Sequence, residues 1–252
     1  MEFTNFELSD FGSRLTSLGG RLGYDNYPLN KYIDIEEFFL DATRFVFADE
    51  RLARCIENWV RTYGFLIGPS KIKKLIEKEK HSYDPAVLGV FLKLIKGTKE
   101  KQLNLDSLST FCSKKEDLTY RSPSKVKVRP NDFDENWIEF NIATQKFVDE
   151  GQKNLLNFEH TLKNTPEIRN RIETDDILCS DYKAYIQREG KDHSLNSICK
   201  RIHSHYSNLH KIYTRFEKFG INQKLHQQSL QRKRQVSRKI SSPCDQMQPD
   251  RK

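Results

Sequence analysis

The sequence contains few cysteines and no long apolar segment. Its five cysteines include no Cys-x-x-Cys pair, and an odd, dispersed set argues against a disulfide framework and for a reducing compartment. The longest apolar runs, such as Phe45–Ala48, are far too short to span a bilayer. The opening MEFTNFELSD is acidic and lacks the apolar stretch of a secretory signal. We therefore expect a cytoplasmic protein without a membrane partner.

The short motifs that mark many enzyme sites are also missing. There is no GxxxxGK[ST] phosphate loop, no GxSxG nucleophile elbow and no HExxH metal-binding helix. The acidic pairs Glu36–Glu37 and Asp175–Asp176 fall in the expected first turns of helices, where the helix dipole favours negative charge. We interpret neither pair as catalytic, and we predict no enzyme activity, cofactor or metal site.

What the sequence does have is a basic C-terminal end. Hydrophobic residues make up 36% of the 252 residues, and 16 Phe and 10 Tyr are enough to build cores. The net charge is +8, of which residues 190–221 carry +4 and residues 222–252 carry +6, leaving −2 for residues 1–189. This gradient suggests an end that binds a polyanion, attached to a nearly neutral body.

Hydrophobic periodicity predicts a mainly α fold that begins with a helical bundle. Residues 35–48, 49–63, 71–80 and 86–96 carry apolar side chains at spacings of three and four, and residues 105–112 add a shorter segment. These lengths suit a small bundle over residues 31–112 with short connections. Residues 1–30 are rich in glycine and polar residues and are expected to form an irregular arm.

Three further segments complete the predicted organisation. Residues 113–163 form a linker or extended arm and a connecting helix, with one short strand possible at 125–129. Residues 164–221 form a helix-turn-helix domain. Residues 222–252 form a basic tail, expected to be disordered.

The helix-turn-helix prediction depends on a trihelical pattern. A first helix covers residues 174–188 and is ended by Gly190; a second begins after Ser194, a favoured N-cap. The turn of residues 203–205 leads to a third helix that ends at Gly220. Its inward positions are expected to be Leu209, Ile212, Tyr213, Phe216 and Phe219.

Residues 194–221, SLNSICKRIHSHYSNLHKIYTRFEKFGI, resemble the winged helix-turn-helix of bacterial transcriptional regulators without a gap. Cys199 stands where the family has a small residue that lets two helices cross closely, and Phe219-Gly220-Ile221 matches the usual exit from the recognition helix. The chain departs from the pattern at His203, where the family's tight turn usually has glycine. It departs again after Ile221, where the alternating apolar residues of a two-stranded wing are missing. The tail is instead expected to be a helix or a disordered arm.

The resemblance implies a transcriptional regulator whose partner is double-stranded DNA. The start of the recognition helix would face base edges, with Asn208 the best candidate for reading adenine, while basic side chains reach phosphates. The expected DNA-binding residues are His205, Tyr206, Ser207, Asn208, Lys211, Arg215, Lys200, Arg201, Arg232, Lys233 and Arg234.

Other interpretations are weaker. Cys199 and the neighbouring histidines 193, 203, 205 and 210 could suggest zinc, but on a helix-turn-helix they face different directions and cannot converge. Arg188 and His193 have the Arg-x4-His spacing of a superfamily of helical RNases, although Gly190 interrupts the helix between them.

The body up to Leu156 is compatible with two roles. It could be the sensor or dimerisation domain of a regulator, and a homodimer is then one possible assembly. It could instead dock a protein partner, as in an antitoxin or a defence-system accessory protein that docks through its winged-helix or N-terminal domain.

Overall fold

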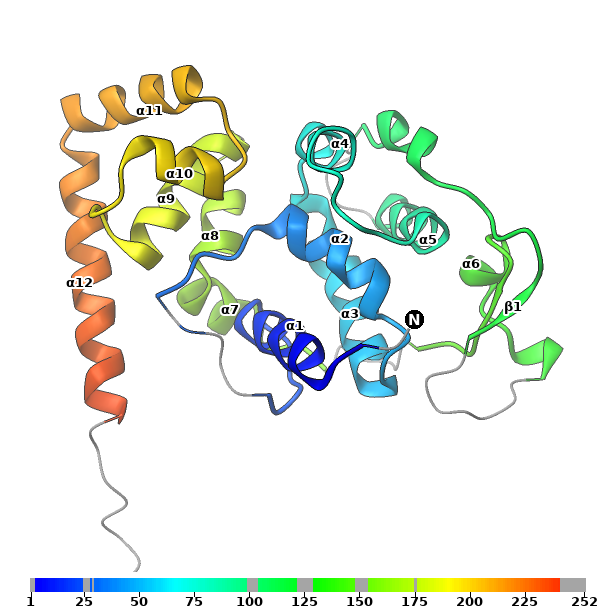
Figure 1. Ribbon diagram of the computed structural model, residues 1–252. Helices are drawn as coiled ribbons and strands as arrows, with labels where there is room; N and C mark the ends of the chain where they lie inside the picture. The colour runs from blue at the N-terminus through cyan, green and yellow to red at the C-terminus, as the bar shows by residue number, and fades with distance from the viewer. Residues whose placement is uncertain are drawn as a thin grey trace, which may run out of the picture.

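The computed structural model describes residues 3–24, 28, 30–98, 104–121, 129–147, 154–174 and 176–240, and of residues 232–240 it describes the backbone alone. The described chain is mainly helical, with one pair of two-residue strands, which confirms the predicted fold class (Figure 1).

The N-terminal body is built from five α-helices and two short 3-10 helices. Aspartate side chains at positions 34, 49 and 84 accept hydrogen bonds from the first-turn N–H groups of the helices that follow them. The four helices predicted from periodicity are therefore confirmed, with ends that differ from the predicted ones by at most three residues. The elements are α1 (Asn5–Ser17), α2 (Ile35–Phe45), α3 (Glu50–Tyr63), η1 (Gly64–Leu66), α4 (Pro69–Glu77), α5 (Pro85–Lys96) and η2 (Asp106–Phe111).

Helix α1 corrects the prediction of an irregular N-terminal arm. Thr4 and Glu7 form a capping box, in which the Thr4 hydroxyl accepts from the Glu7 N–H and the Glu7 carboxylate accepts from the Thr4 N–H. Phe11 and Leu15 are fully buried, and the Phe11 ring stacks on Phe38 of α2 with centroids 5.1 Å apart. The glycines suggested irregularity, but the capping box and this apolar stripe produce a helix.

The segment after the bundle contains little regular structure. Strand β1 (Thr119–Tyr120) pairs in parallel with β2 (Ile142–Ala143), and between them lie η3 (Pro130–Asp132) and α6 (Glu135–Ile138). Trp137 of α6 is completely buried against Phe47 and Phe91. The strand predicted at residues 125–129 lies mostly outside the described residues.

The C-terminal unit consists of six helices, and the longest of them runs along its outer edge (Figure 1). They are α7 (Phe158–Asn164), α8 (Pro166–Glu173), α9 (Ile177–Glu189), α10 (Leu195–Arg201), α11 (Tyr206–Lys218) and α12 (Ile221–Ile240). Helix α12 corrects the prediction of a disordered tail for residues 222–240; residues 241–252 lie outside the described residues.

Two hydrophobic cores form, and each includes at least one residue from the other part of the chain. The larger core joins α1 to α6 and includes Ile168 of α8. The smaller joins α9 to α12 and includes Tyr32, which precedes α2 and lies 5.9 Å from Tyr185, measured between ring centroids. Body and C-terminal unit are therefore interlocked.

Candidate nucleic-acid interface

Helices α9, α10 and α11 form the trihelical unit. Gly190, with φ of 94°, ends α9, and the Ser194 hydroxyl caps α10 by accepting from the Ser197 N–H. His203 has φ of 52°, a left-handed conformation in which histidine is enriched among non-glycine residues. The predicted turn at residues 203–205 is therefore confirmed, and histidine takes the conformation for which glycine is usually chosen.

The interior of this unit follows most of the predicted apolar stripe, with Tyr213 only partly buried. Leu209, Ile212 and Phe216 of α11 are buried, as is Cys199 of α10. The ring of Tyr182 on α9 packs on Phe216 with centroids 5.6 Å apart. The prediction that Phe219 faces inward is wrong. Its side chain is 65% exposed, because the residue lies at the C-cap, where the chain leaves the helix.

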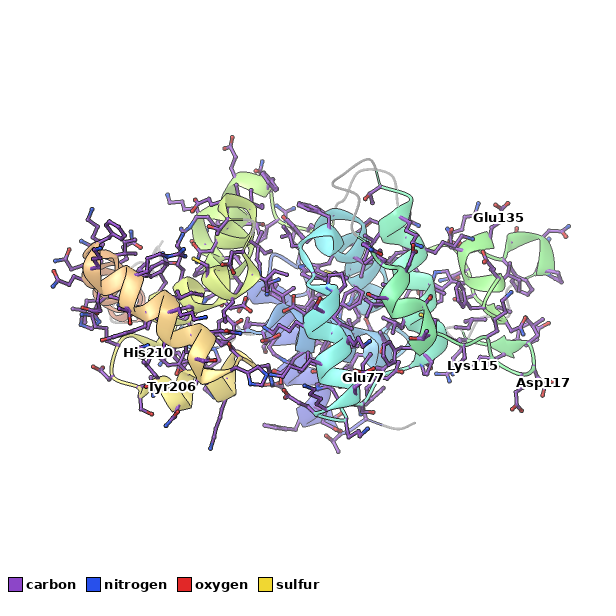
Figure 2. All side chains as sticks on the ribbon, turned by 90° about the horizontal axis from the view of Figure 1, so that it is seen from above. Glu77, Lys115, Asp117, Glu135, Tyr206 and His210 are labelled. Carbon is purple, nitrogen blue, oxygen red and sulfur yellow. The ribbon has the colours of Figure 1, made fainter. Side chains whose placement is uncertain are left out.

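The outer face of α11 is polar and open. Of the expected DNA-binding residues, those with exposed side chains are His205, Tyr206, Ser207, Asn208, Lys211, Arg215, Lys200 and Arg201. The rings of Tyr206 and His210 stack at a centroid distance of 5.7 Å, and both are seen on α11 at one end of the molecule in Figure 2. Within the described residues, Lys211 makes no ion pair. This face thus offers donors and positive charge to a ligand.

Residues 221–240 form helix α12 and not a two-stranded wing, which agrees with the missing alternation after Ile221. It begins directly after Gly220, whose φ is 64°. The Tyr182 hydroxyl donates to the Asn222 side chain at 3.1 Å, and Leu225 is buried. Arg232, Lys233 and Arg234 lie on the backbone of α12, but their side chains are outside what the structure describes.

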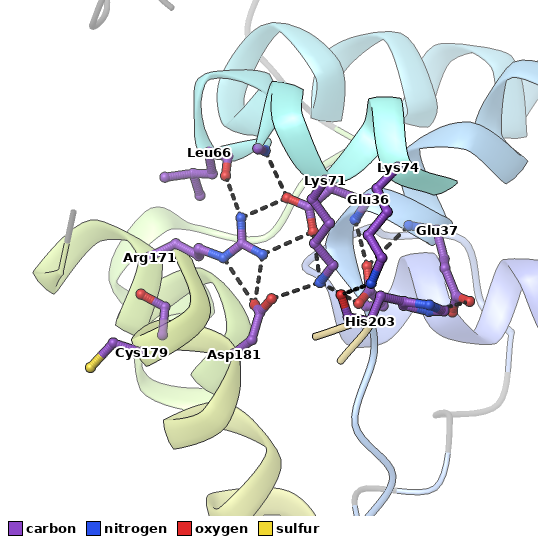
Figure 3. A network of polar contacts seen from close by, with 12 residues as sticks. Glu36, Glu37, Leu66, Lys71, Lys74, Arg171, Cys179, Asp181 and His203 are labelled. Carbon is purple, nitrogen blue, oxygen red and sulfur yellow. Dashed lines mark hydrogen bonds and ion pairs between the residues drawn. The ribbon is translucent and has the colours of Figure 1, made fainter. Parts of the chain in front are cut away.

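A buried ionic network connects this unit to the body (Figure 3). Arg171 of α8 donates to both carboxylate oxygens of Glu36 on α2, at 2.7 and 2.9 Å, and to Asp181 of α9 at 2.6 Å. The Gly68 N–H also donates to Glu36, at 2.7 Å. Burial alone would raise the pKa of Glu36, but Arg171 and Lys71 outweigh it and hold this pKa well below its usual range.

Lys71 of α4 supplies the second cation of the network. One carboxylate oxygen from each of Asp34, Glu36 and Asp181 lies within 4.8 Å of the other two, and three carboxylates this close could hold a metal ion. The Lys71 ammonium already lies 2.5, 3.2 and 2.6 Å from these three groups. Burial raises the pKa of Asp34 to about 6 in spite of Lys71. The chain's own lysine therefore serves as the counter-ion.

His203 forms a second connection, immediately before α11. One ring nitrogen lies 2.8 Å from Glu37 of α2, the other contacts Glu79, and the Lys74 ammonium donates to the His203 carbonyl. Burial would lower the pKa of His203, but the hydrogen bond to Glu37 and the nearby carboxylates outweigh it and raise this pKa. The turn between α10 and α11 is thus held against the body. Sequence reasoning missed these contacts, since no local pattern reports partners 166 positions apart.

Neither the zinc site nor the Arg188–His193 pair considered in the sequence analysis is assembled in the described residues. Cys199 is buried and His203 binds carboxylates, while His205 and His210 are exposed, so these groups do not converge on an ion. Arg188 is buried and its guanidinium donates to Glu167 at 2.8 and 2.9 Å. His193 instead packs edge-on against Tyr185.

Comparison with known proteins finds no matching family model, no matching curated protein and no matching solved structure. None of the helices in the described part of the chain is both long enough and apolar enough to cross a bilayer.

Proposed function

We propose that this protein is a cytoplasmic DNA-binding transcriptional regulator that contacts duplex DNA through α11. The observation that carries the proposal is the combination of a left-handed turn at His203 with an α11 whose buried stripe leaves its polar, basic face open. A helix supported on one side and open on the other is the form in which helix-turn-helix proteins present side chains to the major groove.

The contacts follow from the order of residues along α11. Ser207 and Asn208 lie in its first turn, the end that enters the groove, and an asparagine amide pairs with adenine by donating and accepting in one plane. Lys211 and Arg215 follow one and two turns later, where a basic side chain reaches phosphates. Lys200 and Arg201 at the end of α10 extend the same positive surface.

The test is a pair of binding titrations with the full chain, one on a duplex selected from random DNA and one on scrambled duplex. We expect Asn208→Ala to weaken binding to the selected duplex by about 1–3 kcal/mol and to leave binding to scrambled duplex nearly unchanged. Lys211→Ala should weaken both alike, because a phosphate contact carries no sequence information directly.

The matched control replaces Asn131 and Lys146 with alanine, since both are exposed in the body. It should bind both duplexes as the wild type does, and all variants should keep the wild-type melting temperature. Normal binding by an Asn208/Lys211 double mutant would overturn the proposal.

A second candidate function, docking of a protein partner as in an antitoxin or defence-system accessory protein, is favoured by one observation. Phe219 and Leu230 on the same unit are 65% and 42% exposed, and they would mark an interface where they belong to one contiguous apolar patch. If the wild type binds no duplex even at low salt, this candidate leads. Sedimentation of the wild type beside Phe219→Ser then shows whether the partner is a second copy.

A further inference from the structure

His203 lies in the turn between α10 and α11, and each of its two ring nitrogens faces a carboxylate. The Nε2 atom lies 2.8 Å from Glu37 of α2 (Figure 3), and the Nδ1 atom contacts Glu79, which follows α4. An ionised carboxylate only accepts hydrogen bonds, so a ring nitrogen that bonds to one must carry a proton. A neutral imidazole has one N–H group and can bond to one of these partners, whereas the imidazolium can bond to both.

The surroundings of the ring favour this charged form. Burial would raise the pKa of Glu37, but the hydrogen bond from His203 outweighs it and, with the charge of His81, holds this pKa below its usual range. Asp34 adds a further negative charge near the ring. The cation nearest to the turn is Lys74 of α4, whose ammonium donates to the His203 carbonyl and not to the ring. The charges facing the ring are therefore mainly negative, and they stabilise the imidazolium.

The first turn of α11 depends on the preceding turn for its position. His205 is the N-cap residue of α11, and its side chain makes no capping hydrogen bond. Residues 205–208 are exposed, and the chain is anchored in the smaller core only at Ile202 before them and at Leu209 after them. Between these two anchors, His203 is the one residue in the described part of the chain whose side chain bonds to the body. Its two contacts therefore fix the segment that leads into the proposed groove-facing residues.

We propose that His203 is a positioning residue for α11, and that a proton on its ring strengthens the binding of duplex DNA. This inference rests on the proposed function. A ring bonded to both carboxylates fixes the turn, so that Ser207 and Asn208 meet the groove already ordered. When the ring is neutral, one of its nitrogens presents a lone pair to a carboxylate and that contact becomes repulsive. The turn then loosens, and binding must also supply the free energy that orders it.

The experiment is a titration of the full chain with the selected duplex at pH 6 and pH 9, at one fixed salt concentration. The reference chain carries His205→Gln and His210→Gln, because these exposed histidines would otherwise titrate beside the phosphates. We expect the reference chain to bind about three- to tenfold more weakly at pH 9, the scale of one or two partly exposed ion pairs. Adding His203→Asn, which tolerates the left-handed backbone but carries no charge, should make the affinity the same at both pH values.

A second variant keeps the contact and removes its dependence on the proton. Glu79→Gln places an amide beside the ring, and an amide can donate to a bare nitrogen or accept from an N–H group. Its affinity should therefore change little between pH 6 and pH 9. The matched control is Glu77→Gln, which removes a carboxylate that is 45% exposed at the end of the same helix and pairs with Lys73. It should keep the pH dependence of the reference chain.

A measurement without DNA separates this inference from the proposed function. In an NMR pH titration of the reference chain, the amide resonances of residues 204–208 should shift with the same midpoint as the His203 ring, and His203→Asn should abolish this shift. If no duplex binds at either pH while these resonances shift together, the proposed function fails and the positioning role of His203 stands. Equal duplex affinity at both pH values, a pH dependence that survives His203→Asn, or no shared titration would overturn the inference.

Discussion

The guanidinium of Arg171 meets the carboxylate of Glu36 through two hydrogen bonds, across 135 positions of sequence. The side chain of Arg171 is 2% exposed and that of Glu36 is fully buried. Helix α8 of the C-terminal unit is thereby tied to α2 of the body.

We expect Arg171→Met to destabilise the fold by on the order of 3–5 kcal/mol, because Glu36 and Asp181 would remain buried without this cation. Arg171→Lys should restore only part of the loss, since an ammonium cannot make the two-pronged contact. The measurement is the free energy of unfolding from urea titration. Lys96→Met, which removes an exposed pair with Asp106, should change it by less than about 1 kcal/mol. A loss at Arg171 no larger than this would contradict the assignment.

The contribution of His203 should depend on pH. Its folded pKa is raised above the ordinary 6.5, so the stabilisation is fully present below about pH 6.5 and is lost as the pH rises through the raised value. The groups facing it are Glu37 on α2, with Asp34 before that helix, and Glu79 and Lys74 from the α4 side.

The measurement for His203 compares melting temperatures of the wild type and His203→Asn at pH 6 and pH 9. Asparagine tolerates the left-handed backbone but carries no charge, so the backbone conformation is matched. We expect a larger deficit in the variant at pH 6 than at pH 9. A deficit that is the same at both pH values would show that the ring's charge contributes nothing.

Removal of residues 232–252 should reduce the salt dependence of DNA binding, if the proposed function holds. This segment contains seven Lys/Arg and two Asp. Each lost phosphate contact lowers the slope of log K against log salt by about 0.9. The truncation keeps Asn222 and Leu225, which belong to the fold, so the melting temperature should stay near wild type. An unchanged slope would show that the end of α12 takes no part in binding.

Replacement of Lys71 by alanine should create a dependence on divalent cations. Three carboxylates would lose their shared counter-ion, so the variant should be less stable, and millimolar Mg²⁺ or Ca²⁺ should raise its melting temperature. The wild type should respond to neither ion. Lys73→Ala on the same helix, where the side chain is 49% exposed, is the control. Equal responses of Lys71→Ala and Lys73→Ala would count against the role given to Lys71.

Local pattern was sufficient to predict most of the helices and the exposed residues of α11. Periodic apolar spacing located α2 to α5, and a serine N-cap and a glycine stop located α10 and the end of α9. The same reasoning missed α1, because the glycines of residues 1–30 were taken to indicate an irregular arm and the capping box of Thr4 and Glu7 was not considered. For residues 222–240 it expected disorder and kept a helix as the alternative, because the few apolar positions, such as Leu225, need the smaller core to pack against.

The ionic network and other long-range contacts could not be predicted in this way. Glu36 was correctly placed in a first helical turn, but that position says nothing about Arg171. Arg121 and Phe47 likewise come together only when the β1 segment returns to the end of α2. Contacts of this kind depend on the packing of distant elements, which single-sequence periodicity does not report.

The position of α8 limits how the C-terminal unit can move. Its Ile168 lies in the core of the body, while Glu167 and Arg171 make buried ion pairs with Arg188 and Asp181 of α9. A gradual tilt of α9 would separate charges in surroundings that cannot solvate them, so intermediate angles are costly. Any reorientation of α9 should therefore break these ion pairs together and not stretch them gradually.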